Sequence, residues 1–126
     1  MEYATPSVVW VAGSYGSDGT GRCVARSTNG GRTWRLCLSE PTAPGRMPTS
    51  LSAPAGTVAY IWSGGLRVTR DAGKTGRKVN THRSFQPTAH WVIDFVTPTT
   101  GWMLRYDSAQ LFKTADGGAH WRPQLT

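Results

Sequence analysis

The sequence carries one short pattern three times: STNGGRTW at Ser27–Trp34, TRDAGKTG at Thr69–Gly76 and TADGGAHW at Thr114–Trp121. We refer to these stretches as the first, second and third octet. Aligned on their third residues, they recur after 42 and 45 residues (29 to 71 and 71 to 116). A period of roughly 40–50 residues is typical of the blades of a β-propeller. The octets therefore predict a repeat architecture.

Each octet has the chemistry of a tight hairpin. Its third residue is Asn or Asp and its fifth is Gly, and these residue types tolerate the positive φ values that tight turns require. The Asn or Asp side chain can accept hydrogen bonds from backbone N–H groups ahead of it. A terminal Trp, present in the first and third octets, can pack over the hairpin and bury a large area. We interpret the octets as structural elements rather than ligand sites.

The octets resemble the Asp-box, or bacterial neuraminidase repeat, whose pattern is Ser/Thr-x-Asp-x-Gly-x-Thr-Trp. Three positions depart from it: Asn29 replaces Asp, Gly76 replaces Trp and His120 replaces Thr. Residues 94–102 and 111–114 also look like the sialidase-like repeats of photosystem II assembly-factor propellers. The resemblance implies a structural role for Ser27, Asn29, Gly31, Trp34, Thr69, Asp71, Gly73, Thr114, Asp116, Gly118 and Trp121.

The repeats predict an all-β fold of about three four-stranded antiparallel blades within a single segment, residues 1–126. Blade 1 covers about 1–40, blade 2 about 48–82 and blade 3 about 89–126. Only Met1 precedes Glu2, whereas residues 90–93 precede the equivalent Asp94 of blade 3, so the inner strand of blade 1 is expected to be clipped. The expected strands are 1–5, 8–14, 22–28 and 33–39, then 49–53, 57–63, 65–70 and 76–81, then 90–96, 101–106, 109–114 and 120–125.

The composition agrees with a turn-rich β protein. The 126 residues include 15 Gly and 8 Pro, and no apolar run approaches the length of a membrane span. The first residues lack the basic and apolar regions of a signal peptide. The net charge is +7, but the basic residues are dispersed and no nucleic-acid motif accompanies them. We therefore expect neither a membrane span nor a specific nucleic-acid partner.

The two cysteines face each other if the first octet forms a symmetric hairpin centred on residue 30. Cys23 would then lie opposite Cys37, and opposed Cβ atoms lie about 4.5–5.5 Å apart. A disulfide needs about 3.5–4.5 Å, so a bridge is one expectation and a pair of buried free thiols is the other. A bridge would favour an extracytoplasmic or secreted location. The cysteine spacing and the absence of a paired His disfavour zinc.

The sequence predicts no catalytic residue, metal or cofactor. A glycosidase needs two carboxylates facing each other across a cleft, and two of the seven acidic residues belong to octets. There is no Ser-His-Asp order, metal-ligand cluster or phosphate-binding loop. Catalysis by this chain alone is therefore not expected.

By analogy with the family, the loops between second and third strands share one face with the loops that join successive blades. The octets occupy the opposite face. Aromatic and Arg side chains on the loop face suit recognition of a protein or glycan. We expect a non-catalytic binding or scaffold propeller, and the alternative is a fragment of a larger sialidase-like glycoside hydrolase. The ligand-binding candidates are Tyr15, Asp18, Arg46, His82, Arg83, Arg105, Tyr106 and Asp107.

Three blades leave two terminal blade faces, and apolar faces of this kind are normally covered. Two chains could complete a six-bladed ring, in keeping with the preference for closed symmetric assemblies. The alternatives are further blades on a longer polypeptide or on a different chain. The partners expected are thus the chain itself or missing blades, together with a protein or glycan ligand.

Overall fold

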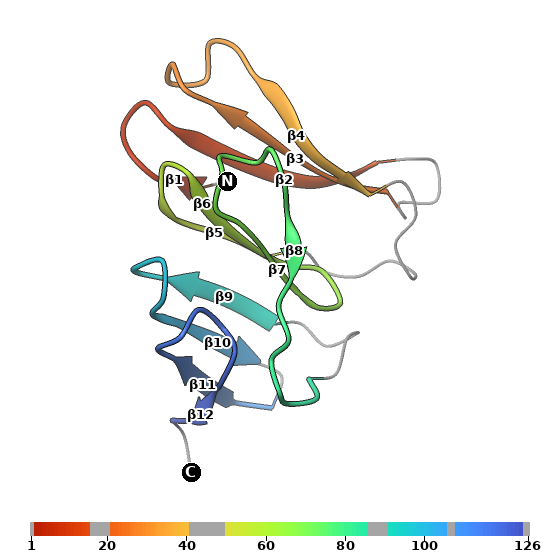
Figure 1. Ribbon diagram of the computed structural model, residues 1–126, viewed down its shortest axis with the longest axis vertical. Helices are drawn as coiled ribbons and strands as arrows, with labels where there is room; N and C mark the ends of the chain where they lie inside the picture. Colours follow the sequence, from red (N-terminus) through yellow and green to blue (C-terminus); the bar gives the residue numbers. More distant parts are fainter. Residues whose placement is uncertain (1, 16–20, 41–49, 86–90, 106–107, 125–126) are drawn as a thin grey trace.

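The computed structural model describes residues 2–15, 21–40, 50–85, 91–105 and 108–124. Its twelve strands form three four-stranded antiparallel sheets, and each strand pairs only with its neighbours in sequence. Figure 1 shows the three sheets arranged one after another along the long axis. The fold is therefore all-β, with three propeller blades, as the octet period predicts. Among the described residues, no helix could cross a membrane.

The strands follow the expected order. Blade 1 contains β1 (Glu2–Tyr3), β2 (Val9–Tyr15), β3 (Gly21–Ser27) and β4 (Arg35–Glu40). Blade 2 contains β5 (Ser50–Ala55), β6 (Val58–Trp62), β7 (Leu66–Thr69) and β8 (Arg77–Lys78). Blade 3 contains β9 (Trp91–Phe95), β10 (Gly101–Arg105), β11 (Gln110–Thr114) and β12 (Arg122–Pro123).

Burial follows the position of each blade. Every residue of β6 is buried, because blade 2 lies between the other two blades. In β9, Trp91, Ile93 and Phe95 are buried, whereas Val92 and Asp94 are exposed. This alternation arises because one face of blade 3 packs on blade 2 and the other face is open. A strand covered on both faces reads as a continuous apolar run, as β6 does.

The three octets close their hairpins with the same bonds. In the third octet, the hydroxyl of Thr114 accepts the N–H of Gly118 at 3.0 Å and donates to Asp116 at 2.9 Å. Asp116 in turn accepts the backbone N–H of His120 at 2.9 Å. The corresponding bonds are present in the first octet and in the second. Side chains thus satisfy the backbone of each turn.

Two departures from the repeat pattern preserve one further side-chain bond. In the second octet, Thr75 donates its hydroxyl proton to Asp71. In the third octet, the ring of His120 makes this contact with Asp116 at 2.7 Å. In the first octet the direction of this hydrogen bond is reversed, because the amide of Asn29 donates to the hydroxyl of Thr33 at 2.8 Å. His120 therefore replaces the usual Thr, and Asn29 the usual Asp, without loss of this hydrogen bond.

These bonds favour the ionised form of the two octet aspartates. The side-chain and backbone hydrogen bonds from Thr75 lower the pKa of Asp71 to about 2. The backbone and ring hydrogen bonds from His120 lower the pKa of Asp116 to about 2. Hydrogen bonds to a carboxylate stabilise its charge, which is the cause of both shifts.

The octets all lie beside the first turn of their own blade. The N–H of the fourth octet residue donates to a turn carbonyl: Gly30 to Ser7, Ala72 to Thr57 and Gly117 to Thr99, at 2.9, 3.0 and 2.9 Å. In each blade, the octet and the turn between its first two strands therefore occupy the same end. The β6–β7 turn lies at the other end, as the sequence analysis expected for loops of this type.

The two blade interfaces have separate cores. A small cluster joins blades 1 and 2: Trp10, Val24, Ala53, Ala59 and Ile61. A larger, aromatic cluster joins blades 2 and 3, and in it Tyr60 and Phe95 stack with ring centroids 3.7 Å apart. Its buried members are Val58, Tyr60, Trp62, Leu66, Val68, Phe85, Trp91, Ile93, Phe95, Met103 and Trp121.

The expected disulfide is wrong, because both cysteines are free. A bulge at Val24 and Ala25 shifts the β3–β4 register, so that Cys23 pairs with Ser39 rather than Cys37. The thiol of Cys37 instead lies near the carbonyl of Ala72 in blade 2, at 3.8 Å. The symmetric hairpin assumed from the octet did not allow for this bulge, which moves the two residues out of register.

Candidate functional site

A cavity of about 180 Å³ lies at the loop end of blade 2. It forms where the β6–β7 turn meets the connection that follows β8. The turn is tight, since Gly64 has a φ of 72° and the N–H of Ser63 donates to the carbonyl of Gly65 at 3.1 Å. Figure 1 shows the connection leaving β8 and passing alongside blade 3. The cavity is therefore built from two segments of the loop face.

Aromatic packing fixes the floor of the cavity. Trp62, Leu66 and Phe85 line it and are 2%, 1% and 9% exposed. The ring of Phe85 makes edge contacts with Trp62 and Trp91, at centroid distances of 6.1 and 5.1 Å. Offset and edge-on aromatic contacts of this kind are favourable. The floor is thus part of the core between blades 2 and 3 and is preorganised.

The rim of the cavity is basic and polar. Lys78, Thr81, Arg83 and Ser84 contribute to its lining. The guanidinium of Arg83 lies over the ring of Phe112, 4.7 Å from the ring centroid, and such cation–π contacts are favourable. The hydroxyl of Thr81 donates to the carbonyl of Arg83 at 2.8 Å. These contacts hold one positive charge in place at the mouth.

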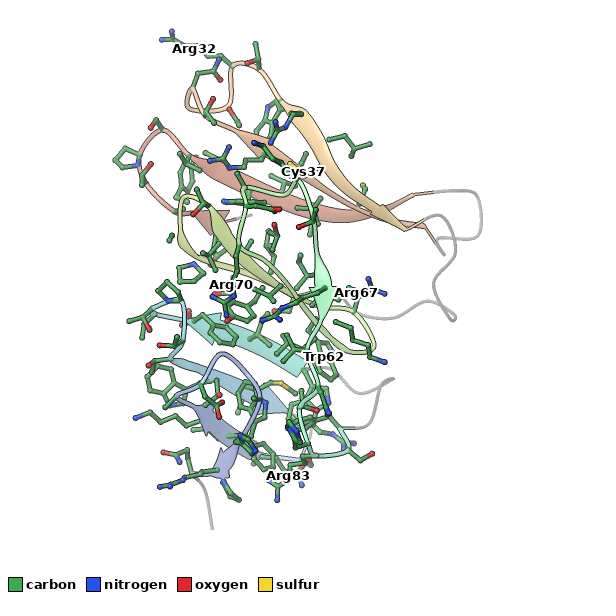
Figure 2. All side chains as sticks on the ribbon, in the orientation of Figure 1. Arg32, Cys37, Trp62, Arg67, Arg70 and Arg83 are labelled. Carbon is green, nitrogen blue, oxygen red and sulfur yellow. The ribbon has the colours of Figure 1, made fainter. Side chains whose placement is uncertain are left out.

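One donor at the cavity lacks an acceptor. Trp62 lines the cavity, and its buried indole N–H has no hydrogen-bond partner among the described residues. Buried polar groups are normally paired, and an unpaired one calls for an explanation. Figure 2 shows Trp62 between blades 2 and 3, with Arg83 farther along blade 3. An apolar floor, an unpaired donor and a basic rim together suit a ligand with an apolar group and an acceptor.

The structure distributes the predicted binding residues over different places. Arg83 lines the cavity. His82 instead faces the third octet: its ring stacks on His120 at 4.6 Å and its Nδ1 contacts the carbonyl of Ala119 at 2.9 Å. Arg105 ends β10, where it pairs with Trp91 and Gln110. The side chain of Tyr15 and the residues Asp18, Arg46, Tyr106 and Asp107 lie outside the described part.

Sequence reasoning missed several lining residues. Trp62 and Leu66 flank the Ser63–Gly65 turn, and Lys78 precedes the connection after β8. The available signal was the turn itself, because the strands that flank a tight hairpin place their terminal side chains at its mouth.

The acidic residues of the described part do not line this cavity. Asp71 and Asp116 are held by their own octets. Asp94 is exposed on β9, opposite Trp102 of β10. Within the same residues, no group of three or more His, Cys, Asp or Glu could hold a metal ion.

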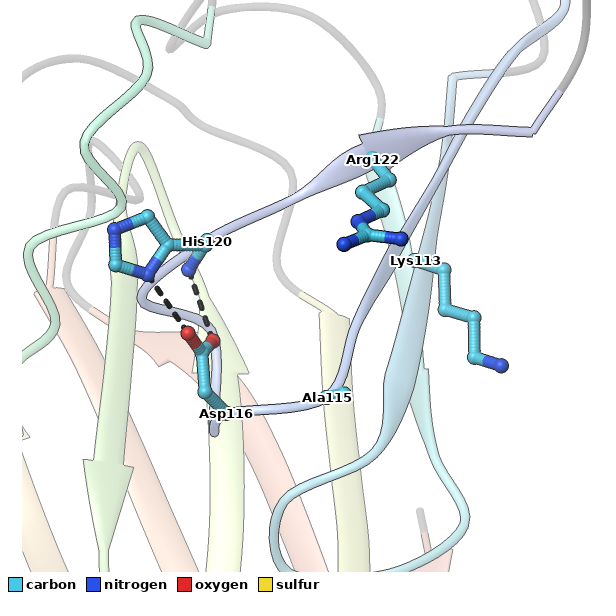
Figure 3. Close-up of a pocket in the computed structure, with 5 residues that line it drawn as sticks. All are labelled: Lys113, Ala115, Asp116, His120 and Arg122. Atoms are coloured by element: carbon cyan, nitrogen blue, oxygen red, sulfur yellow. Dashed lines mark hydrogen bonds and ion pairs between the residues drawn. The ribbon is translucent and has the colours of Figure 1, made fainter.

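A second cavity, of about 370 Å³, lies between the third octet and β12 and is lined by Lys113, Ala115, Asp116, His120 and Arg122 (Figure 3). The equivalent hollow beside the second octet, about 200 Å³, is lined in part by Asp71, Thr75 and Arg77. Because the hollow recurs at the same place in two blades, it belongs to the repeat geometry. It is not a site specific to one blade.

Comparison with known proteins reveals similarity in structure alone. No family model matches the chain, and no curated protein matches it. A structure of YCF48 bound to D1 peptide aligns over 98% of this chain with a TM-score of 0.70 and 17% identity. YCF48 from Cyanidioschyzon merolae aligns over 95% with a TM-score of 0.59 and 17% identity. A GH74 xyloglucanase from Xanthomonas campestris aligns over 91% with a TM-score of 0.56 and 18% identity.

The chain spans 38% of each YCF48 chain and 18% of the xyloglucanase chain. One of these similar structures is a complex with a peptide, and another is a GH74 xyloglucanase. Identities this low relate the chain to them through its fold. The fold they share with it is the β-propeller.

Proposed function

We propose that this chain is a non-catalytic binding propeller that holds a segment of another protein at the Trp62–Arg83 cavity. The observation that carries the proposal is the buried aromatic floor beneath a rim containing Lys78 and Arg83. Aromatic and Arg side chains are enriched among residues that dominate binding energy. Paired with an acidic group on the ligand, Arg83 would form a charge-assisted hydrogen bond.

The size of the cavity favours a peptide over a small molecule. Pockets that enclose small ligands usually measure about 300–1,000 Å³, whereas this one measures about 180 Å³. It has room for one bulky side chain of a ligand that otherwise runs across the surface. The YCF48 structure bound to D1 peptide is an instance of a similar fold in complex with a peptide.

A displayed peptide library, selected on the chain and followed by fluorescence polarisation, tests the proposal. We expect selected peptides to share an apolar residue next to Asp or Glu. Arg83→Ala should weaken their binding about tenfold or more, since a charge-assisted hydrogen bond contributes about 1.5–3 kcal/mol. Arg32→Ala is the matched control, because Arg32 is exposed on the first octet. Equal binding by the two variants would reject this site.

We also propose that the octets are Asp-boxes and that a glycan is the second candidate ligand. The hydrogen bonds of Asp71 and Asp116 support the first proposal. The aromatic floor supports the second, since sugars stack on aromatic rings. A glycan array separates the two ligand classes: glycan binding that Arg83→Ala abolishes, without peptide selection, would favour the glycan.

The competing function is that of a fragment of a larger glycoside hydrolase. The similarity to a GH74 xyloglucanase favours it, because the chain aligns with 18% of that enzyme. The full-length gene would distinguish the two readings, since an enzyme would supply a carboxylate pair from further blades. Hydrolysis of a sialoside or of xyloglucan by the chain would overturn the non-catalytic proposal.

We further propose that two chains complete a six-bladed ring, with blades from a longer polypeptide as the alternative. Exposed Tyr3, Trp34 and Leu36 on blade 1 and Val92 on blade 3 support an association through the terminal blades. An extracytoplasmic location is also proposed, although the free cysteines remove the disulfide that favoured it. Cell fractionation tests the location, and the mass of the chain in solution tests the association.

A further inference from the structure

The hydrogen-bonded register identifies equivalent positions in the three blades. The first octet residue pairs with the second strand at Val9, Ala59 and Gly101. Residues at the same distance in sequence from these paired positions are equivalent in the three blades. Three such sets lie on the side of each blade that faces the following blade. They are Trp10, Tyr60 and Trp102 on the second strand; Arg26, Val68 and Lys113 before the octet; and Arg35, Arg77 and Arg122 after it.

In blade 1, these positions donate hydrogen bonds to blade 2. Arg26 donates through Nε and an NH2 group to the carbonyl of Gly56, at 3.0 and 2.8 Å. Arg35 donates to the carbonyl of Ala72 in the second octet at 3.0 Å. Both acceptors are backbone groups that every repeat possesses. The interface between blades 1 and 2 is therefore joined by two arginines and two repeat carbonyls.

The interface between blades 2 and 3 uses the same turn carbonyl with a different donor. The hydroxyl of Tyr60 donates to the carbonyl of Pro98 at 2.7 Å and accepts from Arg70 at 3.0 Å. Pro98 is equivalent to Gly56, since each precedes the residue whose carbonyl bonds to its octet. A donor from one blade to this carbonyl of the next is thus a repeated feature.

Blade 3 has the donors of this contact on a face that no other described blade covers. Lys113 lies over the ring of Trp102, 5.4 Å from its centroid, and Arg122 pairs with it across the ladder. Figure 3 shows both side chains beside the third octet. Among the described residues, neither charged group has a hydrogen-bond acceptor. Like charges directly opposite each other are unfavourable, so acceptors on a partner would relieve this arrangement.

Blade 1 has the acceptors of this contact on a face that no other described blade covers. Pro6 is equivalent to Gly56 and Pro98, because Ser7 accepts the N–H of Gly30. Gly30 is in turn equivalent to Ala72, the acceptor for Arg35. Next to these carbonyls, blade 1 exposes apolar side chains: Tyr3, Trp34 and Leu36 are 63%, 46% and 62% exposed.

We infer that the open face of blade 3 docks on the open face of blade 1 of a second copy of this chain. In this contact, Lys113 donates to the carbonyl of Pro6 and Arg122 donates to the carbonyl of Gly30. The contact is head-to-tail, and using it twice closes a ring of six blades. The inference rests on the ring completion proposed above and assigns the atoms that make it. The Trp62–Arg83 cavity is not involved.

Light scattering coupled to gel filtration tests the docking. Wild type should have twice the mass of 13.7 kDa. A Lys113→Glu/Arg122→Glu variant should raise the dimer dissociation constant about tenfold or more, because two charge-assisted donors are lost. Leu36→Asp, on the opposite face, should have a similar effect. The control is Lys74→Glu, at an exposed residue of the second octet, and it should remain a dimer.

Mixing the two dissociated variants tests whether the contact is head-to-tail, with blade 3 of one chain on blade 1 of the other. A mixed dimer contains one chain of each variant and two contacts between blade 3 and blade 1. All the substitutions fall in one of these contacts, and the other contact is that of wild type. The mixture should therefore contain more dimer than either variant alone. Circular dichroism confirms that each variant is folded. A monomeric wild type overturns both the ring and the docking. A dimeric wild type that the blade 3 variant leaves intact overturns the docking alone, as does a mixture that stays monomeric.

Discussion

The interface between blades 2 and 3 is large and aromatic, whereas the interface between blades 1 and 2 is small and bridged by arginines. Tyr60 stacks on Phe95 in the first of these, and Trp10 occupies the position equivalent to Tyr60 in the second. The side chains facing Trp10 include Ala53 and Ala59. One backbone repeat therefore supports two kinds of contact.

The difference shows where stability and binding reside. Burial of apolar area stabilises by about 25 cal/mol per Å², so the aromatic interface contributes more than the small one. Arg26 and Arg35 compensate in part, through hydrogen bonds to Gly56 and Ala72. The binding cavity has its floor in the aromatic interface, which gives Trp62 and Phe85 fixed positions. We expect blade 1 to separate before blades 2 and 3.

The largest effect is expected at the last octet residue. Trp121 is 8% exposed and Trp34 is 46% exposed, although both donate to a glycine carbonyl of their own octet. Trp121→Ala should lower the free energy of unfolding by about 3–5 kcal/mol. Trp34→Ala should cost about 1 kcal/mol, since most of its interaction is one hydrogen bond. Urea unfolding of dilute protein measures both losses. Equal losses of unfolding free energy would contradict the prediction that Trp121 contributes more to stability than Trp34.

The next effect separates contact with a preceding blade from backbone strain. Gly118 and Gly31 have φ values of 96° and 92°. A Cβ on Gly118 would lie 2.5 Å from Leu66 of blade 2, whereas one on Gly31 would meet only its own Trp34, at 3.5 Å. Both Ala variants should lose about 1 kcal/mol from strain. Gly118→Ala should lose a further 1–3 kcal/mol, roughly, from overpacking.

Thermal unfolding in dilute solution compares these two variants. A smaller loss for Gly118→Ala than for Gly31→Ala would mean that Leu66 yields without cost. The packing of the third octet on blade 2 would then be looser than the structure shows.

Removal of the arginine bridge should weaken the interface of blade 1 selectively. Arg26→Ala deletes two hydrogen bonds to Gly56 and the contact of the guanidinium over Trp10, at 5.3 Å. We expect a loss of about 1–3 kcal/mol. Limited proteolysis should show blade 1 cut first in this variant. The exposed Arg32→Ala is the control, and an unchanged cleavage pattern in Arg26→Ala would show that the bridge contributes nothing.

Lowering the pH should destabilise the second and third octets, whereas the first octet should be unaffected. Asp71 and Asp116 have pKa values of about 2, below the ordinary value of 3.8, whereas the first octet has Asn29. The unfolded chain binds protons more readily, so this stabilisation is present above about pH 4 and is lost as the pH falls toward 2. Asp116→Asn should make urea unfolding less dependent on pH between 4 and 2. A slope identical to that of wild type would rule out this role for Asp116.

The fold could be predicted because each blade repeats a local signal. The octet chemistry identified the hairpins, and the placement of the remaining strands followed from the spacing of the octets. The outer strands proved shorter, with β8 and β12 of two residues each. Beyond residue 78 the chain leaves the sheet to reach blade 3, and a contact between blades leaves no local signal in the sequence.

The site could be predicted only in part, for the same reason. Arg83 was expected on the loop face and lines the cavity. His82 belongs to the same loop, yet it stacks on His120 of the third octet, because the connection runs along the neighbouring blade. The β3–β4 bulge that separates Cys23 from Cys37 is equally absent from the hairpin pattern. Pattern reasoning locates turns, whereas tertiary packing decides which side chains meet.

Hydrogen exchange read by mass spectrometry compares the three blades within one molecule, because it reports the stability of each blade separately. We expect the slowest exchange in β6 and β10, which flank the aromatic interface. We expect exchange at least about tenfold faster in β2 and β3, as for a blade less stable by more than about 1.4 kcal/mol. Uniform protection of the three blades, or slower exchange in blade 1 than in blade 3, would contradict this expectation.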